Sequence, residues 1–167
     1  MIGEFEFFHG AVLARMLHTA QQALSIRPYS ESDNAAYVIN ENKGIYIKYS
    51  AKRLSPWRFT FQRRHHQVIA EMKRSISEVF IVLVCNDDGA VVLSFDEFQQ
   101  VAKSGEEPAE WLSATRNRRQ MYLVKGPEGR LAFKVGKDDY STKLFGLKPL
   151  AEATETVAAK ACPPGRA

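Results

Sequence analysis

The sequence predicts a single α+β, or mixed α/β, domain with one central sheet, two main helices, a short third helix and a C-terminal β-meander. Three observations support this fold class. Helix-like and strand-like segments alternate along the chain, the apolar run EVFIVLVC (78–85) is typical of a strand buried on both faces, and no repeat or linker divides the sequence. We expect residues 1–150 to form this domain and the alanine- and proline-rich residues 151–167 to be a disordered tail.

The first predicted element is an amphipathic helix over residues 5–24. Its apolar side chains recur at three- and four-residue spacing, namely Phe5, Phe8, Val12, Met16, Ala20 and Ala23. His9 lies on the apolar side of this helix. We expect it to be a packed histidine with one hydrogen-bond partner rather than a metal ligand.

A strand hairpin is predicted next, after a break at RPYSESDN (27–34), which is rich in turn-forming residues. AAYVIN (35–40) and GIYIKYS (44–50) read as its two strands, and the link Glu41-Asn42-Lys43 suits a turn that needs positive φ. SPWRFTF (55–61) indicates a further short strand, begun at a proline that an edge position tolerates.

The period then changes to that of a helix over residues 62–76, with Val68, Ile69, Met72 and Ile76 as the apolar stripe and His65 in its middle. The apolar strand 78–85 follows, and NDDG turns the chain into the strand AVVLS. Ser94 and Glu97 form a capping box for a short helix at 95–103. Strand-like segments complete the predicted meander, at 110–113, 119–125 and 130–135.

Composition places the chain among ordinary globular proteins. It has 167 residues, of which 45% are hydrophobic and 25% charged. No apolar run approaches the roughly 18 residues of a membrane span, and the N-terminus MIGEFEFFHG lacks the early basic residues of a secretory signal. Cys85 lies in an apolar run and Cys162 in the tail, so no disulfide framework is expected. We therefore predict a cytoplasmic protein that does not contact a membrane.

Positive charge is concentrated in the middle of the chain. Residues 43–74 contain nine basic residues and one acid, a net charge of +8, whereas the remainder has a net charge of −4. Such asymmetry favours an anionic partner, although a solvated surface balanced by acidic neighbours also accounts for it. The residues expected to contact the phosphates of a nucleic acid are Lys48, Lys52, Arg53, Arg58, Arg63 and Arg64.

Aromatic residues accompany these cations. Trp57, Phe59 and Phe61 recur at two-residue spacing, so they either stack on unpaired bases or form the core-facing side of a strand. The basic groups between them are available in both cases. A second basic cluster, Arg116, Arg118 and Arg119, would extend the surface if the meander folds back beside it.

Several catalytic motifs are absent from the sequence. It contains no GxxxxGK[ST], GxSxG, HExxH or CxxC motif. The sequence therefore gives no support to the commonest classes of nucleotide triphosphatase, hydrolase, zinc protease or redox protein. Cys85 is better explained as a core residue than as a nucleophile, because an apolar environment raises the pKa of a thiol. Motifs of this kind therefore identify no reaction.

The order of helix, strand hairpin, basic strand, helix and buried strand over residues 4–85 resembles the core of the PD-(D/E)XK nuclease superfamily. The resemblance implies a site that cuts nucleic acid, with a metal ion held by an acid on one hairpin strand and an acid-x-lysine motif on the next. If Lys48 is the motif lysine, Tyr46 occupies the position of the acid and Asn40 that of the other acid. Both carboxylates are then missing. The segments GIYIKYS and RLSPWRFTF also resemble an uncharacterised group of bacterial proteins, which implies no function.

A second alignment with the motif uses Glu41-Asn42-Lys43, with Asp33 as the other acid and Glu6 as a possible third. Carboxylates are needed because anionic oxygens must hold the divalent cation that activates water. Mg²⁺ or Mn²⁺ would be the cofactor. A plain hairpin turn explains the same three residues without any chemistry.

Three functional hypotheses follow. The first is a nucleic-acid-binding domain with a nuclease-like core and no complete metal site. The second is an active metal-dependent nuclease that uses Asp33, Glu41 and Lys43, with Glu6. The third is a protein-interaction or self-assembly module whose basic face meets an acidic protein partner.

Overall fold

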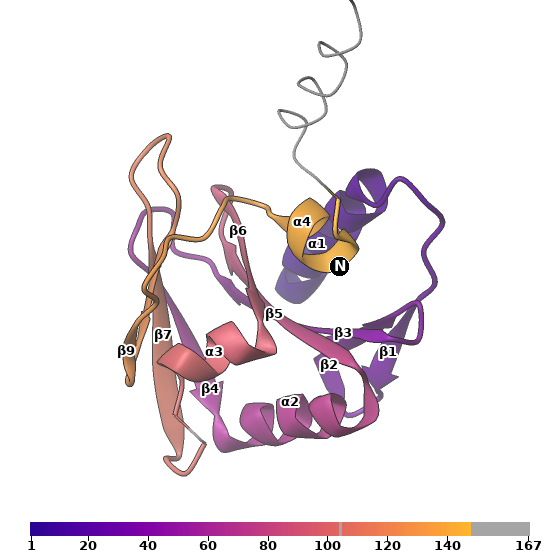
Figure 1. Cartoon of the computed structure of the whole chain (residues 1–167), viewed down its shortest axis with the longest axis horizontal. Coiled ribbons are helices and arrows are strands. Elements are labelled where there is room, and N and C mark those ends of the chain that lie inside the picture. The colour runs from indigo at the N-terminus through magenta and orange to yellow at the C-terminus, as the bar shows by residue number, and fades with distance from the viewer. Residues whose placement is uncertain (104, 148–167) are drawn as a thin grey trace, which may run out of the picture.

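The structure is a computed structural model that describes residues 1–103 and 105–147, and this part of the chain forms helices and two sheets (Figure 1). The helices are α1 (Glu4–Thr19), α2 (Arg63–Ser75), α3 (Phe95–Val101) and α4 (Tyr140–Phe145). The first sheet contains β1 (Ile26–Ser30), β2 (Asp33–Ile39), β3 (Lys43–Ser50), β5 (Glu78–Cys85) and β6 (Gly89–Ser94). The second sheet contains β4 (Trp57–Gln62), β7 (Ala109–Thr115), β8 (Leu123–Gly126) and β9 (Gly129–Arg130).

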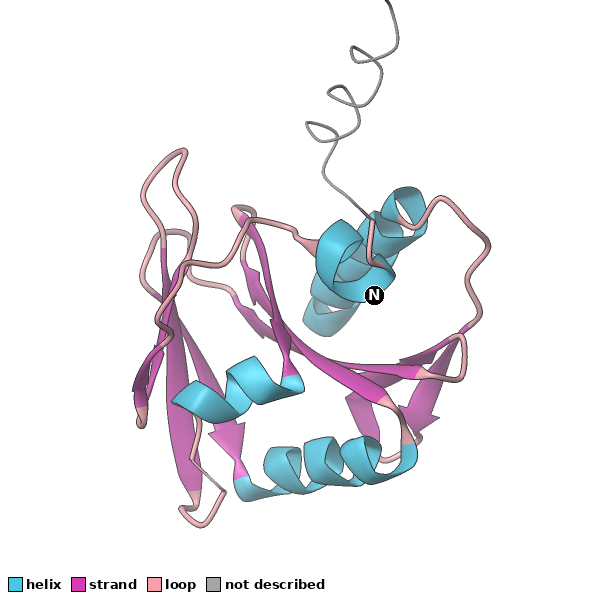
Figure 2. Ribbon diagram, in the orientation of Figure 1, coloured by secondary structure: helices cyan, strands magenta, loops and turns pink. Residues whose placement is uncertain are grey.

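The first sheet is the centre of the molecule and is covered on both faces (Figure 2). Its strand order is β1-β2-β3-β5-β6, with β3 and β5 parallel and the other neighbours antiparallel. One face packs against α1 and α4, and the opposite face packs against α2, α3 and the second sheet. Every residue of β5 after Glu78 is buried, which confirms the prediction of a strand covered on both sides.

The second sheet begins with β4, which the chain reaches from β3 through the loop 51–56. Along β4 buried and exposed side chains alternate strictly, in the order Trp57, Arg58, Phe59, Thr60, Phe61 and Gln62. The three rings belong to the core cluster between the two sheets. The core-facing interpretation of these aromatics is therefore confirmed, and Arg58 points away from them.

Local signals in the sequence are reproduced in the structure. The hairpin link has positive φ at Asn40 and Glu41, as its turn chemistry predicts. Ser94 Oγ accepts a hydrogen bond from the Glu97 backbone at 3.2 Å, and Glu97 Oε2 accepts one from the Ser94 backbone at 2.8 Å. This is the capping box that starts α3.

The α+β class is confirmed, but the arrangement differs from the prediction in several places, including a first helix that ends at Thr19 and a last strand that covers only Gly129–Arg130. β4 pairs with β7 rather than with the central sheet, so the predicted meander becomes part of a second sheet. The predicted turn region contains β1, an edge strand in which the missing N–H of Pro28 is tolerated. α4 is an additional helix, capped by Asp139 and buried through Tyr140 and Leu144. Residues 151–167, predicted to be a disordered tail, lie outside the described residues.

Two glycines give a test of this packing. A Cβ on Gly126 would lie 2.1 Å from the carbonyl oxygen of Val101, at the end of α3, whereas a Cβ on Gly10 in α1 would meet no atom within 4 Å. We expect G126A to lower the free energy of unfolding by about 2 kcal/mol, because backbone must move to accept the methyl group. G10A should raise it by about 0.5–1 kcal/mol, because alanine restricts the unfolded chain and favours a helix.

Urea denaturation of the two variants against the wild type measures both effects. A G126A protein as stable as the wild type would show that the β8–β9 hairpin does not pack closely on α3.

Candidate functional site

Strands β2 and β3 separate at one end of the central sheet. Their pairing runs from Ile39 opposite Lys43 to Ala36 opposite Tyr46. Beyond that point β3 continues, while β2 turns away and pairs only with β1, through Asp33 opposite Ser30. The strand edge of β3 is therefore open near Lys48, and side chains from neighbouring elements gather there.

A cavity of about 740 Å³ occupies this separation, and we call it the β2–β3 cavity. Its walls come from α1, the start of β2, the end of β3, the exposed side of β4 and the first turns of α2. Its polar side chains are those of His9, Ser32, Asp33, Asn34, Tyr46, Lys48, Tyr49, Arg58, Thr60, Arg64 and His65. This volume is in the range of pockets that hold small ligands.

Three cations face one carboxylate in the β2–β3 cavity. Lys48, Arg58 and Arg64 come from β3, β4 and α2, and Asp33 is the acidic residue of the lining. Among the described residues, none of the three cations has a carboxylate oxygen within 4.0 Å. Burial lowers the pKa of Lys48, the negative charge of Asp33 raises it and the positive charge of Arg64 lowers it further. The cavity therefore has excess positive charge.

Asp33 is held by its neighbours. Its Oδ2 accepts a hydrogen bond from the Tyr46 hydroxyl at 3.0 Å, and its Oδ1 accepts one from the Ala35 backbone at 2.8 Å. Burial, followed by the charge and the hydrogen bond of Asp33, raises the pKa of Tyr46 above its ordinary range. Tyr46 therefore remains a hydrogen-bond donor to this carboxylate at neutral pH.

Two buried histidines complete the polar lining. His65 Nδ1 accepts a hydrogen bond from the Gln62 backbone at 3.0 Å at the start of α2, which leaves its proton on Nε2. The pKa of His65 is lowered to about 4, mainly by burial and then by the positive charges of Lys48 and Arg64. His9 Nδ1 lies 3.0 Å from the Tyr37 hydroxyl, and burial lowers its pKa. The prediction of a packed His9 with a hydrogen-bond partner is confirmed.

The six basic residues expected to form one surface do not all line the same cavity. Lys48, Arg58 and Arg64 line the β2–β3 cavity. Lys52 Nζ donates to the Pro56 carbonyl at 3.0 Å, and Arg53 lines a second cavity. Arg63 donates to the Glu106 carbonyl at 2.6 Å, in a separate hollow that it shares with Arg74.

The acids of the nuclease hypothesis are also separated. Glu41 is paired with Arg27 through two hydrogen bonds of 2.8 and 2.9 Å, and Lys43 Nζ lies 3.4 Å from Glu78. Lys43 lies opposite the last residue of β2 and Glu41 lies beyond it, about 20 Å from Asp33 at roughly 3.3 Å per residue. Glu6 accepts from the backbone of the N-cap residue of α1 and does not line the β2–β3 cavity.

The structure thus brings Asp33 next to Lys48 but brings neither Glu41, Lys43 nor Glu6 to them. Within residues 1–103 and 105–147, no group of three or more His, Cys, Asp or Glu side chains is arranged to hold a metal ion. Local patterns did not predict the Asp33–Lys48 approach. An uninterrupted hairpin would place Lys48 opposite residue 34, but the pairing ends at Ala36 and Tyr46.

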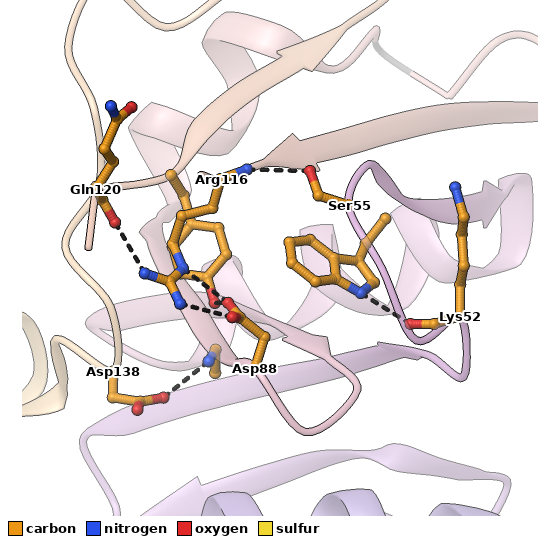
Figure 3. A network of polar contacts seen from close by, with 9 residues as sticks. Lys52, Ser55, Asp88, Arg116, Gln120 and Asp138 are labelled. Carbon is orange, nitrogen blue, oxygen red and sulfur yellow. Dashed lines mark hydrogen bonds and ion pairs between the residues drawn. The ribbon is translucent and has the colours of Figure 1, made fainter. Parts of the chain in front are cut away.

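The second cavity, of about 890 Å³, adjoins a junction between the sheets that is centred on Arg116 (Figure 3). The guanidinium donates to both oxygens of Asp88 at 2.8 and 2.5 Å and to the Gln120 carbonyl at 3.1 Å, and Tyr122 also donates to Asp88. The hydrogen bonds of Arg116 lower the pKa of Asp88, partly offset by burial. The charge of Arg116 is therefore neutralised by Asp88. Arg118, from the same predicted basic cluster, also lines this cavity.

The state of His65 predicts how stability depends on pH. A histidine in the unfolded chain has its ordinary pKa of 6.5, whereas His65 in the folded chain has a pKa of about 4. As the pH falls from about 6.5 to 4, the unfolded state takes up more protons, so the free energy of unfolding decreases. H65Q preserves a capping side chain at the third helix position. Between pH 7.5 and 5, we expect the free energy of unfolding of H65Q to fall by on the order of 1–2 kcal/mol less than that of the wild type.

Urea denaturation at each pH measures this change. H18Q, which makes the same substitution at an exposed position of α1, is the matched control. Burial also lowers the pKa values of His9 and His66, so H65Q is expected to reduce the slope and not to abolish it. An unchanged slope in H65Q would contradict a neutral His65.

Comparisons with protein-family models, curated proteins and solved structures find no match to this chain. Among the described helices, none has the length and apolar character needed to cross a lipid bilayer. The arrangement around the β2–β3 cavity is therefore the basis for a functional proposal.

Proposed function

We propose that this protein binds nucleic acid, with phosphate groups held at the β2–β3 cavity. The observation that supports the proposal is the approach of Lys48, Arg58 and Arg64 from three different elements, without an ion-pair partner among the described residues. Lysine and arginine neutralise phosphates, and most protein–nucleic acid hydrogen bonds go to the phosphate backbone. Lys48 is half-buried and Arg58 and Arg64 are exposed, so like charges that repel one another remain accessible to a ligand that is itself anionic.

The position of Arg64 strengthens the attraction for an anion. It is the second residue of α2, a helix of 13 residues, so its side chain lies near the positive end of the helix dipole. His65, the next residue, is neutral at pH 7 and can donate from Nε2. Cations and neutral donors therefore surround the same space.

The residues of the β2–β3 cavity favour a protein that binds nucleic acid without cleaving it. The proposal keeps the nuclease-like core that residues 4–85 of the sequence resemble. Tyr46 occupies the position of the motif acid two residues before Lys48, and it donates to Asp33, the acidic residue of the lining. One carboxylate that already accepts two hydrogen bonds is a poor ligand set for Mg²⁺ or Mn²⁺.

Neutralising a cavity cation tests the proposal against an adjacent control. R64Q should weaken binding to a short DNA about five- to twenty-fold at low salt and reduce the slope of log affinity against log salt by about 0.7–0.9, because one phosphate contact is lost. R63Q makes the same charge change one residue earlier, on a side chain that faces Glu106 instead of the cavity, and should change affinity less than two-fold. Fluorescence anisotropy over a salt series measures both.

Equal losses in R63Q and R64Q would show that the attraction is a general charge effect without a site. Polyglutamate that competes as well as DNA at equal charge would favour an acidic protein partner instead.

Asp33 separates binding from cleavage. D33N removes the negative charge beside Lys48, so we expect nucleic acid to bind two- to five-fold more tightly, with Tyr46 still able to donate to the amide oxygen. The same measurement with Mg²⁺ or Mn²⁺ should show no cleavage in either protein. Metal-dependent cleavage by the wild type that D33N abolishes would establish the nuclease hypothesis instead, and E41Q serves as its control.

A further inference from the structure

The second sheet has one face packed in the core and one face that no described helix covers (Figure 1). Opposite residues of an antiparallel pair lie on the same face, so the register identifies the uncovered one. Thr60 lies opposite Trp111, and Arg58 opposite Ser113. We call this the outer face, and its central residues are Arg58, Thr60, Trp111, Ser113, Lys125 and Arg130.

A row of side chains crosses the four strands of the outer face and carries cations on β4, β8 and β9, whereas its β7 position is the buried Ser113. Arg58 of β4 is opposite Ser113 of β7, Ser113 is opposite Lys125 of β8, and Lys125 is opposite Arg130 of β9. At about 4.8 Å between strands, the row is about 14 Å long. The three cations are exposed, and among the described residues none has a carboxylate oxygen within 4.0 Å.

Acidic residues are absent from this face of the four strands. Glu110 is the acid within β4, β7, β8 and β9, and it is buried, on the inner side opposite Phe61. Within the four strands, like charges therefore stand in a line without an acidic side chain on the same face, and the exposed Glu128 lies in the turn between β8 and β9. Such an arrangement is electrostatically complementary to a chain of phosphates.

Trp111 supplies an aromatic surface beside this row. Its side chain is 42% exposed, unusual for a residue with so much apolar area, and the guanidinium of Arg58 lies 5.1 Å from its ring centroid. Nucleic-acid bases stack on aromatic rings and on arginine planes. The bases of a duplex are already stacked on one another, so this surface can engage only the bases of an unpaired strand.

The outer face is continuous with the β2–β3 cavity, because Arg58 and Thr60 belong to both. We propose that the outer face binds single-stranded nucleic acid, with a base on Trp111 and phosphates on Arg58, Lys125 and Arg130, and that the strand continues into the β2–β3 cavity. This inference rests on the proposed function and specifies its substrate class.

Affinity measurements with single-stranded and duplex DNA of equal length test the inference. With an oligothymidylate of about 12 nucleotides, W111L should weaken binding ten-fold or more, because one base stack is lost, and should change duplex binding less than two-fold. F133L is the matched control: Phe133 is 46% exposed with Lys143 over its ring at 5.9 Å, but it lies outside the four strands, and its loss should leave both affinities unchanged.

The row of cations has its own test. The double variant K125Q/R130Q should reduce the slope of log affinity against log salt by about 1.4 on the single strand, because each contact contributes about 0.7. Both substitutions lie at exposed positions of short strands, and thermal denaturation confirms that each variant is folded.

Fluorescence gives a readout that does not depend on affinity. The chain has two tryptophans, of which Trp57 is 3% exposed, so quenching by an oligonucleotide reports on Trp111. Saturating oligothymidylate should quench wild-type emission, and W111F should lose that response. Persistent quenching in W111F would place the stacking base elsewhere and overturn the inference.

The outcomes separate the two proposals. If the wild type binds neither DNA, the proposed function fails and the inference fails with it. If R64Q weakens binding but W111L and K125Q/R130Q do not, or if W111L weakens single-stranded and duplex binding equally, the proposed function stands and the outer face is not the binding surface.

Discussion

The separation of β2 from β3 beyond the pair Ala36–Tyr46 is the constraint on which the candidate site depends. If the two strands stayed paired to the end of β3, backbone and side chains of β2 would cover Lys48. Instead β2 pairs with β1 at its start, through Asp33 opposite Ser30. The opening lets α1, β4 and α2 each bring a side chain to the same space. A cavity between well-packed elements holds such groups more firmly than a loop does.

The charges of the molecule fall into two classes with different consequences. Arg27, Lys43 and Arg116 are paired with Glu41, Glu78 and Asp88, and the Arg116 pair also joins the two sheets. These ion pairs have a structural role, which explains the presence of their charges. The cations of the β2–β3 cavity and of the outer face have no such partner among the described residues, and like charges placed together are a cost to folding. A bound polyanion removes that cost, which is the physical reason for connecting these residues with function.

Arg58 links the two surfaces. It belongs to a strand whose other side forms the core, so the alternation of β4 fixes its direction, and the ring of Trp111 restricts its guanidinium. Lys48 and Arg64 lie on the cavity side, and Lys125 and Arg130 on the sheet side. One extended ligand can therefore contact both, whereas a small anion would use only the cavity.

Features that arise from neighbouring residues could be predicted from local patterns in the chain. Period and turn chemistry predicted the helix over 62–76, the hairpin of β2 and β3, the buried strand 78–85 and the capping box of Ser94, because each is set by interactions within a few residues. The tertiary structure alone decided that β4 pairs with β7, that the six predicted basic residues divide among separate surfaces, and that Asp33 rather than Glu41 lies beside Lys48. Those outcomes depend on which strands pair and where pairing ends. Both are set by packing between residues far apart in the chain, which local patterns do not record.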